Sequence, residues 1–134
     1  MQRLTTLVAT LLLLAGCATS SSGPQAVEKG ELTNAADGTV IAIKRGGELK
    51  VVLDTNPTMN LPWEGDANVG PALAPIGQRI YVGKGMNSYD ITAGGFNIFR
   101  YRAEQPGQVT LHFASRRPEE SAPSRTLHYE VTVE

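Results

Sequence analysis

Apolar and polar residues alternate along several short stretches of the chain, as in a β-strand with one buried and one solvated face. The clearest alternation covers residues 49–53, 109–114 and 127–133. Further β-rich segments cover residues 40–43, 80–82 and 96–103. Turn residues such as Gly46-Gly47 and Gln105-Pro106-Gly107 separate these segments, and no stretch has a sustained helical period. The pattern therefore predicts an all-β domain.

About seven short strands joined by glycine- and proline-rich turns favour an immunoglobulin-like antiparallel β-sandwich. We assign this domain to residues 39–134, where the alternation lies. A small closed barrel is the alternative. Cys17 is the one cysteine of the chain, so the domain has no intrachain disulfide and depends on its hydrophobic core.

Residues 1–16 have the pattern of a signal peptide. A short positively charged start, Met1-Gln2-Arg3, precedes a mostly apolar run over residues 4–14. This run is shorter than the about 20 apolar residues that span a bilayer. It ends in Leu14-Ala15-Gly16-Cys17, which resembles a lipobox. We therefore expect cleavage before Cys17 and attachment of lipid to its thiol.

Residues 17–38 are then expected to form a lipidated flexible tether, because Ser20-Ser21-Ser22-Gly23-Pro24 cannot build a core. Ala18 is not the aspartate that typically retains lipoproteins on the inner membrane. We therefore expect a lipid-anchored protein of the cell envelope, on the outer membrane if the cell is Gram-negative. The chain has 12 Lys and Arg against 13 Asp and Glu, which argues against nucleic acid and against a polybasic membrane patch.

Groups that could perform catalysis are sparse. The sequence has no phosphate-binding glycine loop after a strand and no nucleophile elbow, so it predicts neither an enzyme nor a cofactor. His112 and His128 lie on the outer face of the last two predicted strands, where a hairpin would place them opposite each other near Glu130. Two imidazoles fall short of a closed metal site, so we predict solvated histidines and keep a metal site as the alternative.

Three loops carry the other informative residues. The first begins Asn56-Pro57-Thr58 and reaches Trp63, where an Asn-Pro turn precedes a large ring that can be buried. The second ends Thr92-Ala93-Gly94-Gly95, and paired glycines allow a close approach of the backbone or a positive φ. The third begins Arg116-Arg117-Pro118 and carries charged residues. Each loop alone is compatible with an ordinary turn.

Together, the order and spacing of these loops resemble the chagasin-type inhibitors of papain-like cysteine peptidases. Those proteins have an immunoglobulin-like sandwich with three loops at one pole, whose motifs read NPTTG…W, GxGG and RPW. The resemblance covers residues 39–134. It implies that the first loop enters the active-site cleft and lies over the catalytic cysteine without forming an acyl-enzyme. The other two loops would contact the rims of the cleft.

The resemblance implies a set of peptidase-binding residues, with Trp63 as a support of the first loop. They are Asn56, Pro57, Thr58, Met59 and Asn60, then Thr92, Ala93, Gly94 and Gly95, then Arg117, Pro118 and Glu119. Four of them depart from the motifs: Met59 replaces a threonine, Asn60 and Thr92 replace glycines, and Glu119 replaces the tryptophan. The last change removes a large aromatic anchor of the kind that dominates interfaces.

Because these departures fall on binding loops, a non-inhibitory envelope module for binding or scaffolding is the alternative function. The resemblance also has a geometric consequence. In an immunoglobulin-like sandwich the first strand starts at the pole that carries these loops. We therefore expect the tether to leave from the loop-bearing pole, with the loops turned toward the membrane.

Overall fold

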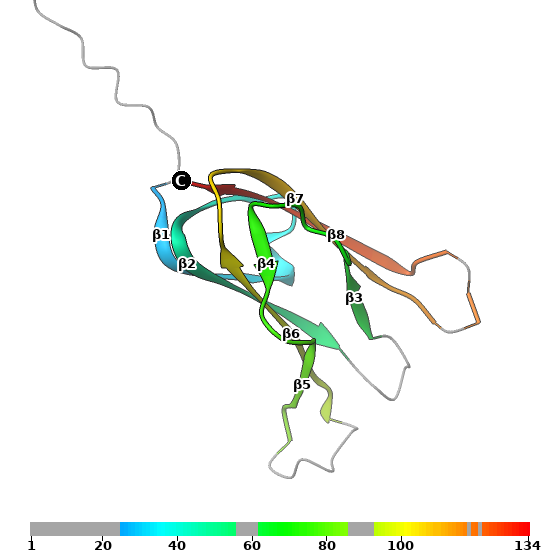
Figure 1. The fold of residues 1–134 in the computed structure, drawn as a ribbon. Helices are drawn as coiled ribbons and strands as arrows, with labels where there is room; N and C mark the ends of the chain where they lie inside the picture. The colour runs from blue at the N-terminus through cyan, green and yellow to red at the C-terminus, as the bar shows by residue number, and fades with distance from the viewer. Residues whose placement is uncertain (1–24, 56–61, 86–92, 118, 121) are drawn as a thin grey trace, which may run out of the picture.

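The computed structural model describes residues 25–55, 62–85, 93–117, 119–120 and 122–134. These residues form one eight-stranded sheet and a single-turn 3-10 helix, η1 (Asn34–Ala36) (Figure 1). The strands are β1 (Val27–Thr33), β2 (Val40–Thr55), β3 (Trp63–Gly65), β4 (Leu73–Pro75), β5 (Ile80–Gly83), β6 (Gly95–Ala103), β7 (Gly107–Ser115) and β8 (Arg125–Val133). The predicted all-β class is confirmed. Within these ranges, no helix is long and apolar enough to cross a membrane.

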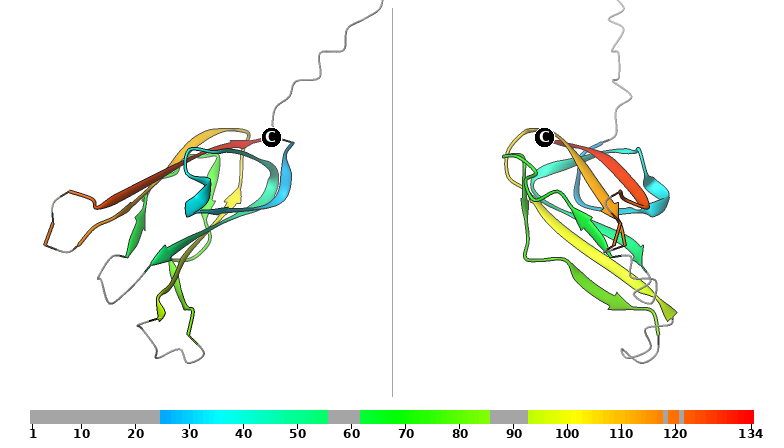
Figure 2. Two further views of the ribbon diagram at one scale, coloured as in Figure 1. Left: turned by 180° about the vertical axis from the view of Figure 1, so that it is seen from behind. Right: turned by 90° about the vertical axis from the view of Figure 1, so that its right-hand side faces the viewer.

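The sheet has the strand order β3-β7-β8-β2-β6-β4, with β1 beside β2 and β5 beside β6. It curls around a single core, so that β7 and β8 lie across from β6, as in the expected sandwich (Figure 2). The core is built from the inward residues of every long strand, which explains the alternation in the sequence. Its largest fully buried side chains are Trp63, Tyr129, Phe113, Ile43, Leu49, Leu53, Leu111, Val51 and Val131.

Strand β2 belongs to both layers of the sandwich. Its first part pairs in parallel with β8, and its second part pairs antiparallel with β6. The change occurs at Gly46 and Gly47, where Gly46 has a φ of 83° and a Cβ on Gly47 would lie 2.6 Å from the carbonyl oxygen of Glu28. The predicted turn between two strands is therefore a bend within one strand.

The start of the domain differs from the prediction. Residues 27–38, expected to be tether, form β1, η1 and the turn that follows. Strand β1 pairs in parallel with β2, from Val27 beside Ile43 to Thr33 beside Val52. Only Leu32 of this strand is buried, so backbone pairing rather than an alternating pattern holds it in the sheet. The tether therefore extends no further than residue 26, and residues 17–24 lie outside the described ranges.

The direction of β1 also corrects the expected exit of the tether. Val27, at the start of β1, and Val133, at the end of β8, are both register partners of Ile43. The two ends of the described domain therefore lie side by side, at the opposite end of the molecule from Thr55, where β2 ends (Figures 1 and 2). The expectation that the first strand starts at the loop-bearing pole is wrong, because β1 runs parallel to the second part of β2, toward that pole.

Candidate functional site

The strand ends that flank the first and second loops meet at one end of the sheet. β2 ends at Thr55 and β5 ends at Gly83, and both residues are register partners of Gly95, where β6 begins. The first loop follows Thr55 and the second loop lies between Gly83 and Gly95. The bases of these two loops are therefore held in adjacent positions by the backbone ladder.

The flanks of the third loop meet the far side of the first loop in the same way. β7 ends at Ser115, which pairs with Trp63 at the start of β3 and with Arg125 at the start of β8. The third loop connects Ser115 to Arg125. All three loops singled out by the sequence therefore start and finish at the same end of the molecule (Figure 1).

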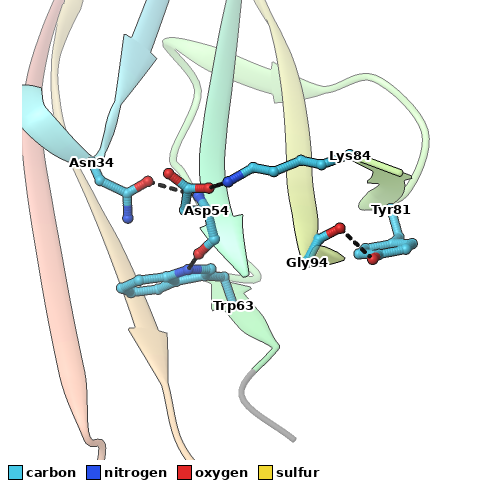
Figure 3. A network of polar contacts seen from close by, with 6 residues as sticks. All are labelled: Asn34, Asp54, Trp63, Tyr81, Lys84 and Gly94. Carbon is cyan, nitrogen blue, oxygen red and sulfur yellow. Dashed lines mark hydrogen bonds and ion pairs between the residues drawn. The ribbon is translucent and has the colours of Figure 1, made fainter. Parts of the chain in front are cut away.

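Trp63 joins the two groups of strand ends. Its side chain is 1% exposed, and its indole Nε1–H donates a 2.7 Å hydrogen bond to the carbonyl oxygen of Asp54, across the base of the first loop (Figure 3). Its backbone N–H donates to Oδ1 of the buried Asn97 at 2.9 Å, and its carbonyl accepts from Arg79 Nη1 at 2.5 Å. The Arg125 guanidinium lies 5.1 Å from the ring centroid. In this buried position Trp63 supports the bases of the first and third loops, and through Asn97 it also contacts β6, which follows the second loop.

A second set of contacts closes the base of the second loop. The Gly94 carbonyl accepts hydrogen bonds from the Lys84 backbone N–H at 3.0 Å and from the Tyr81 hydroxyl at 3.2 Å. The Lys84 ammonium pairs with the Asp54 carboxylate, so it also links the second loop to the first (Figure 3). Asp54 is held in turn by Asn34, whose Oδ1 accepts the Asp54 N–H at 2.7 Å. We call this set of contacts, with those of Trp63, the loop-base network.

The glycine pair of the second loop has an internal packing role. Gly94 has a φ of 73°, in the left-handed region that favours glycine. A Cβ on Gly95 would lie 2.5 Å from the Val82 carbonyl oxygen and 2.6 Å from the Tyr81 ring. Both glycines are buried. The pair therefore allows β5 and Tyr81 to pack against the start of β6, whatever approaches the loop from outside.

The predicted binding residues fall partly within the described ranges. Asn56, Pro57, Thr58, Met59, Asn60, Thr92 and Pro118 lie outside them, as does the predicted lipidation site Cys17. Ala93, Arg117 and Glu119 are exposed at the loop-bearing end. Within the third loop, the Arg117 carbonyl accepts the Glu120 N–H at 3.0 Å.

Sequence reasoning found Trp63 and the glycine pair but missed their partners. Asn97, Tyr81, Lys84 and Asp54 received no role, and nor did Arg79 or Arg125. Asn97 had a detectable signal, since it occupies an inward position of a strand that is otherwise apolar on that face. The others are exposed or half-buried polar residues whose partners are distant in the sequence, so no local pattern marks them.

The two histidines lie where the sequence placed them. His112 and His128 are direct partners across β7 and β8. Each histidine faces a loop aspartate: His112 Nδ1 lies 3.1 Å from Asp66 Oδ2, and His128 Nδ1 lies 3.5 Å from Asp37 Oδ1. Within the described ranges, no three His, Cys, Asp or Glu side chains are grouped as a metal site requires. The histidines thus tie two loops to the sheet.

Comparison with known proteins identifies the family. Among solved structures, a cysteine protease inhibitor from Entamoeba histolytica has a TM-score of 0.65 and 19% identity, over 79% of this chain and 95% of that one. Amebosin has a TM-score of 0.65 and 25% identity, over 79% of this chain and 98% of its own. No curated protein matches the sequence significantly. Residues 42–133 match the family described as chagasin family peptidase inhibitor I42. The chain therefore belongs to the chagasin family, whose members are peptidase inhibitors and not enzymes.

Proposed function

We propose that this protein is a reversible inhibitor of papain-like cysteine peptidases. The loop at residues 56–60 enters the active-site cleft, and the loops at 92–95 and 116–120 contact its rims. Membership of the chagasin family supports inhibition, and the similarity to a cysteine protease inhibitor of Entamoeba histolytica supports this target class. The observation that carries the proposal is the meeting of the bases of all three loops at one end of the sheet, with the buried Trp63 between the first and third loops.

The mechanism is physical rather than chemical. Loops on a rigid scaffold lose little conformational entropy on binding, so more of the contact energy appears as affinity. Here Trp63 and Asn97 fix the far end of the first loop, while the Asp54–Lys84 ion pair links its start to the second loop. The inhibitor would thus block the cleft as a preformed wedge, without a covalent intermediate.

We also propose that the protein is anchored to the cell envelope through lipid on Cys17, on the outer membrane if the cell is Gram-negative. The support is the lipobox-like Leu14-Ala15-Gly16-Cys17 after an apolar run. Because β1 begins beside the C-terminus, a tether joined to it would leave from the end opposite the loops. The loops would then point away from the membrane, toward a peptidase in the aqueous phase.

The inhibition assay uses the mature chain with Cys17→Ser, which carries no lipid, and papain with a small fluorogenic substrate. We expect reversible competitive inhibition, and we expect Thr58→Arg to raise the inhibition constant about 100-fold, because a long charged side chain blocks entry of the wedge. Thr110→Arg, at an exposed position of β7, is the matched control. No inhibition by the wild-type chain at micromolar concentration across papain-like enzymes would contradict the proposal.

One observation favours the alternative of a non-inhibitory envelope module. Glu119 presents an exposed carboxylate where the family motif has tryptophan. If the chain is an inhibitor, Glu119→Trp restores an aromatic anchor and tightens inhibition about tenfold. If it is a binding module, neither protein inhibits, and a pull-down from the envelope recovers a partner that Thr58→Arg does not displace.

A further inference from the structure

Strand β5 exposes three consecutive large apolar side chains. Among the described residues, the exposed large hydrophobic side chains are Val27, Val40, Ile80, Tyr81 and Val82. Ile80 is 50% exposed and Val82 is 46% exposed. Isolated apolar residues on a surface are ordinary, whereas a group of neighbouring exposed apolar side chains is a candidate interaction site.

The register of the sheet extends this group onto two neighbouring strands. Ile98 of β6 pairs with Ile80 on one side and with Val52 of β2 on the other. Phe96 of β6 pairs with Val82. Directly opposed residues of antiparallel strands share one face of the sheet, so these five side chains lie together on the face turned away from the core. We call Val52, Ile80, Val82, Phe96 and Ile98 the β5 face.

The β5 face is continuous with the base of the second loop. β5 leads directly into Lys84, whose ammonium lies 4.7 Å from the centroid of the Phe96 ring and pairs with Asp54. Tyr81, between the two exposed aliphatic residues of β5, donates its hydroxyl hydrogen to the Gly94 carbonyl. The face is therefore held by the same contacts that hold the inhibitory loops, and it ends where they begin.

We propose that the β5 face is an additional docking surface for the inhibited peptidase, contacting apolar surface beside the cleft. The proposal rests on the proposed function. The position of the face favours this partner, because it adjoins the loop-bearing end and lies away from the end where the tether would leave (Figure 1). A second copy of the chain is the other candidate occupant, and it is an outcome of the test below.

The experiment compares two matched double variants of the mature Cys17→Ser chain. Ile80→Thr with Val82→Thr makes the β5 face polar and keeps β-branched residues in the strand. Val27→Thr with Val40→Thr changes two similarly exposed valines, 39% and 49% exposed, on β1 and at the start of β2. We expect the first variant to raise the inhibition constant for papain about tenfold, mainly through faster dissociation, and the second to leave it unchanged.

The wild-type inhibition constant, measured first, separates failure of this proposal from failure of the proposed function. If the wild type inhibits papain and the β5-face variant inhibits equally well, the β5 face is not part of the interface. A wild type that inhibits neither papain nor other papain-like enzymes overturns the proposed function, and this proposal with it.

Amide hydrogen exchange on the wild-type complex gives a second readout that needs no variant. We expect slower exchange at residues 80–83 when papain is bound, and unchanged exchange there would overturn the proposal. A wild-type dimer in sedimentation that the Ile80→Thr, Val82→Thr variant converts to a monomer would assign the face to a second copy instead.

Discussion

Trp63 is buried, but its contacts hold in place loops at the loop-bearing end of the molecule. Its indole N–H and the guanidinium above its ring reach the bases of the first and third loops, and its backbone N–H reaches Asn97 of β6. A family motif drew attention to this tryptophan, but the role of its neighbour Asn97 became visible only in the fold. Residue types alone could not show it, because the Trp63–Asn97 contact joins positions 34 residues apart.

Trp63→Phe tests the hydrogen bond across the base of the first loop. The variant leaves the Asp54 carbonyl without the indole donor, which costs about 1–3 kcal/mol of unfolding free energy, and the smaller ring adds the cost of a cavity in the core. We expect the inhibition constant for papain to rise in the same variant, because the first loop loses the bond across its base. Urea unfolding and the inhibition assay measure the two effects. An unchanged inhibition constant in the destabilised variant would show that the bond does not position the loop.

Two tyrosines make the fold sensitive to alkaline pH. Burial, with a smaller contribution from the Asp66 carboxylate, raises the pKa of Tyr101 to about 12. Burial and then the Asp37 carboxylate raise the pKa of Tyr129 to about 12. The unfolded chain loses these protons near pH 10. Unfolding therefore releases protons between pH 10 and pH 12, and the unfolding free energy falls as the pH rises through that window.

Tyr101→Phe tests this dependence. The difference in unfolding free energy between wild type and variant should be constant from pH 7 to 9. It should then shift in favour of the variant between pH 10 and 12, because the variant has no phenol to ionise at this position. Urea titrations at each pH measure the difference. Parallel curves over the whole range would mean that Tyr101 ionises equally easily in both states.

At the scale of elements, strands with a strong alternation were predictable and short or lightly buried strands were not. Residues 49–53, 96–103, 109–114 and 127–133 lie within β2, β6, β7 and β8. Strands β3 and β4 have three residues each and follow from pairing with β7 and β6, which no local pattern encodes. Strand β1 buries one apolar residue, so its sequence has no alternating pattern to distinguish it from a tether. The resemblance identified the three loops, whereas the loop-base network and the β5 face depend on register.

Alanine variants of Gly94 and Gly70 test whether the position of the second loop affects inhibition, since both glycines have the same left-handed backbone. Gly94 and Gly70 both have a φ of 73°, so replacing either by alanine costs about 1–2 kcal/mol for the left-handed backbone. A Cβ on Gly70 meets nothing within 4 Å, while one on Gly94 lies 3.2 Å from the Thr55 carbonyl oxygen. We expect Gly94→Ala to lose more unfolding free energy than Gly70→Ala, because its Cβ also crowds the Thr55 carbonyl, and only Gly94→Ala to weaken inhibition of papain. If both variants inhibit papain equally well, the second loop does not contribute to binding.

At the scale of the whole molecule, the two ends of the described domain lie opposite the three loops, and this determines how a tethered domain would face its target. Val27 and Val133 meet at Ile43, and the loops lie at the other end of the long strands (Figure 2). A lipid on Cys17 would therefore hold the domain by the end that the target does not use. The length of the tether should matter little under this arrangement, whereas it would limit access if the loops faced the membrane.

Deleting residues 18–24 tests this arrangement on cells. We expect the lipidated, shortened protein to capture added papain as well as the full-length protein does, and the soluble forms to inhibit equally. Retained enzyme activity after washing measures capture on cells. A loss of capture on cells, with inhibition in solution unchanged, would place the loops toward the membrane instead.

The central claim is that the loop-bearing end occupies the active-site cleft of a cysteine peptidase without reacting with it. The most direct measurement is the rate at which iodoacetamide alkylates the catalytic cysteine of papain as the mature Cys17→Ser chain is added. We predict that the rate falls in proportion to the bound fraction and that intact chain is recovered after dissociation. Alkylation at an unchanged rate with saturating chain, or recovery of cleaved chain, would contradict the account.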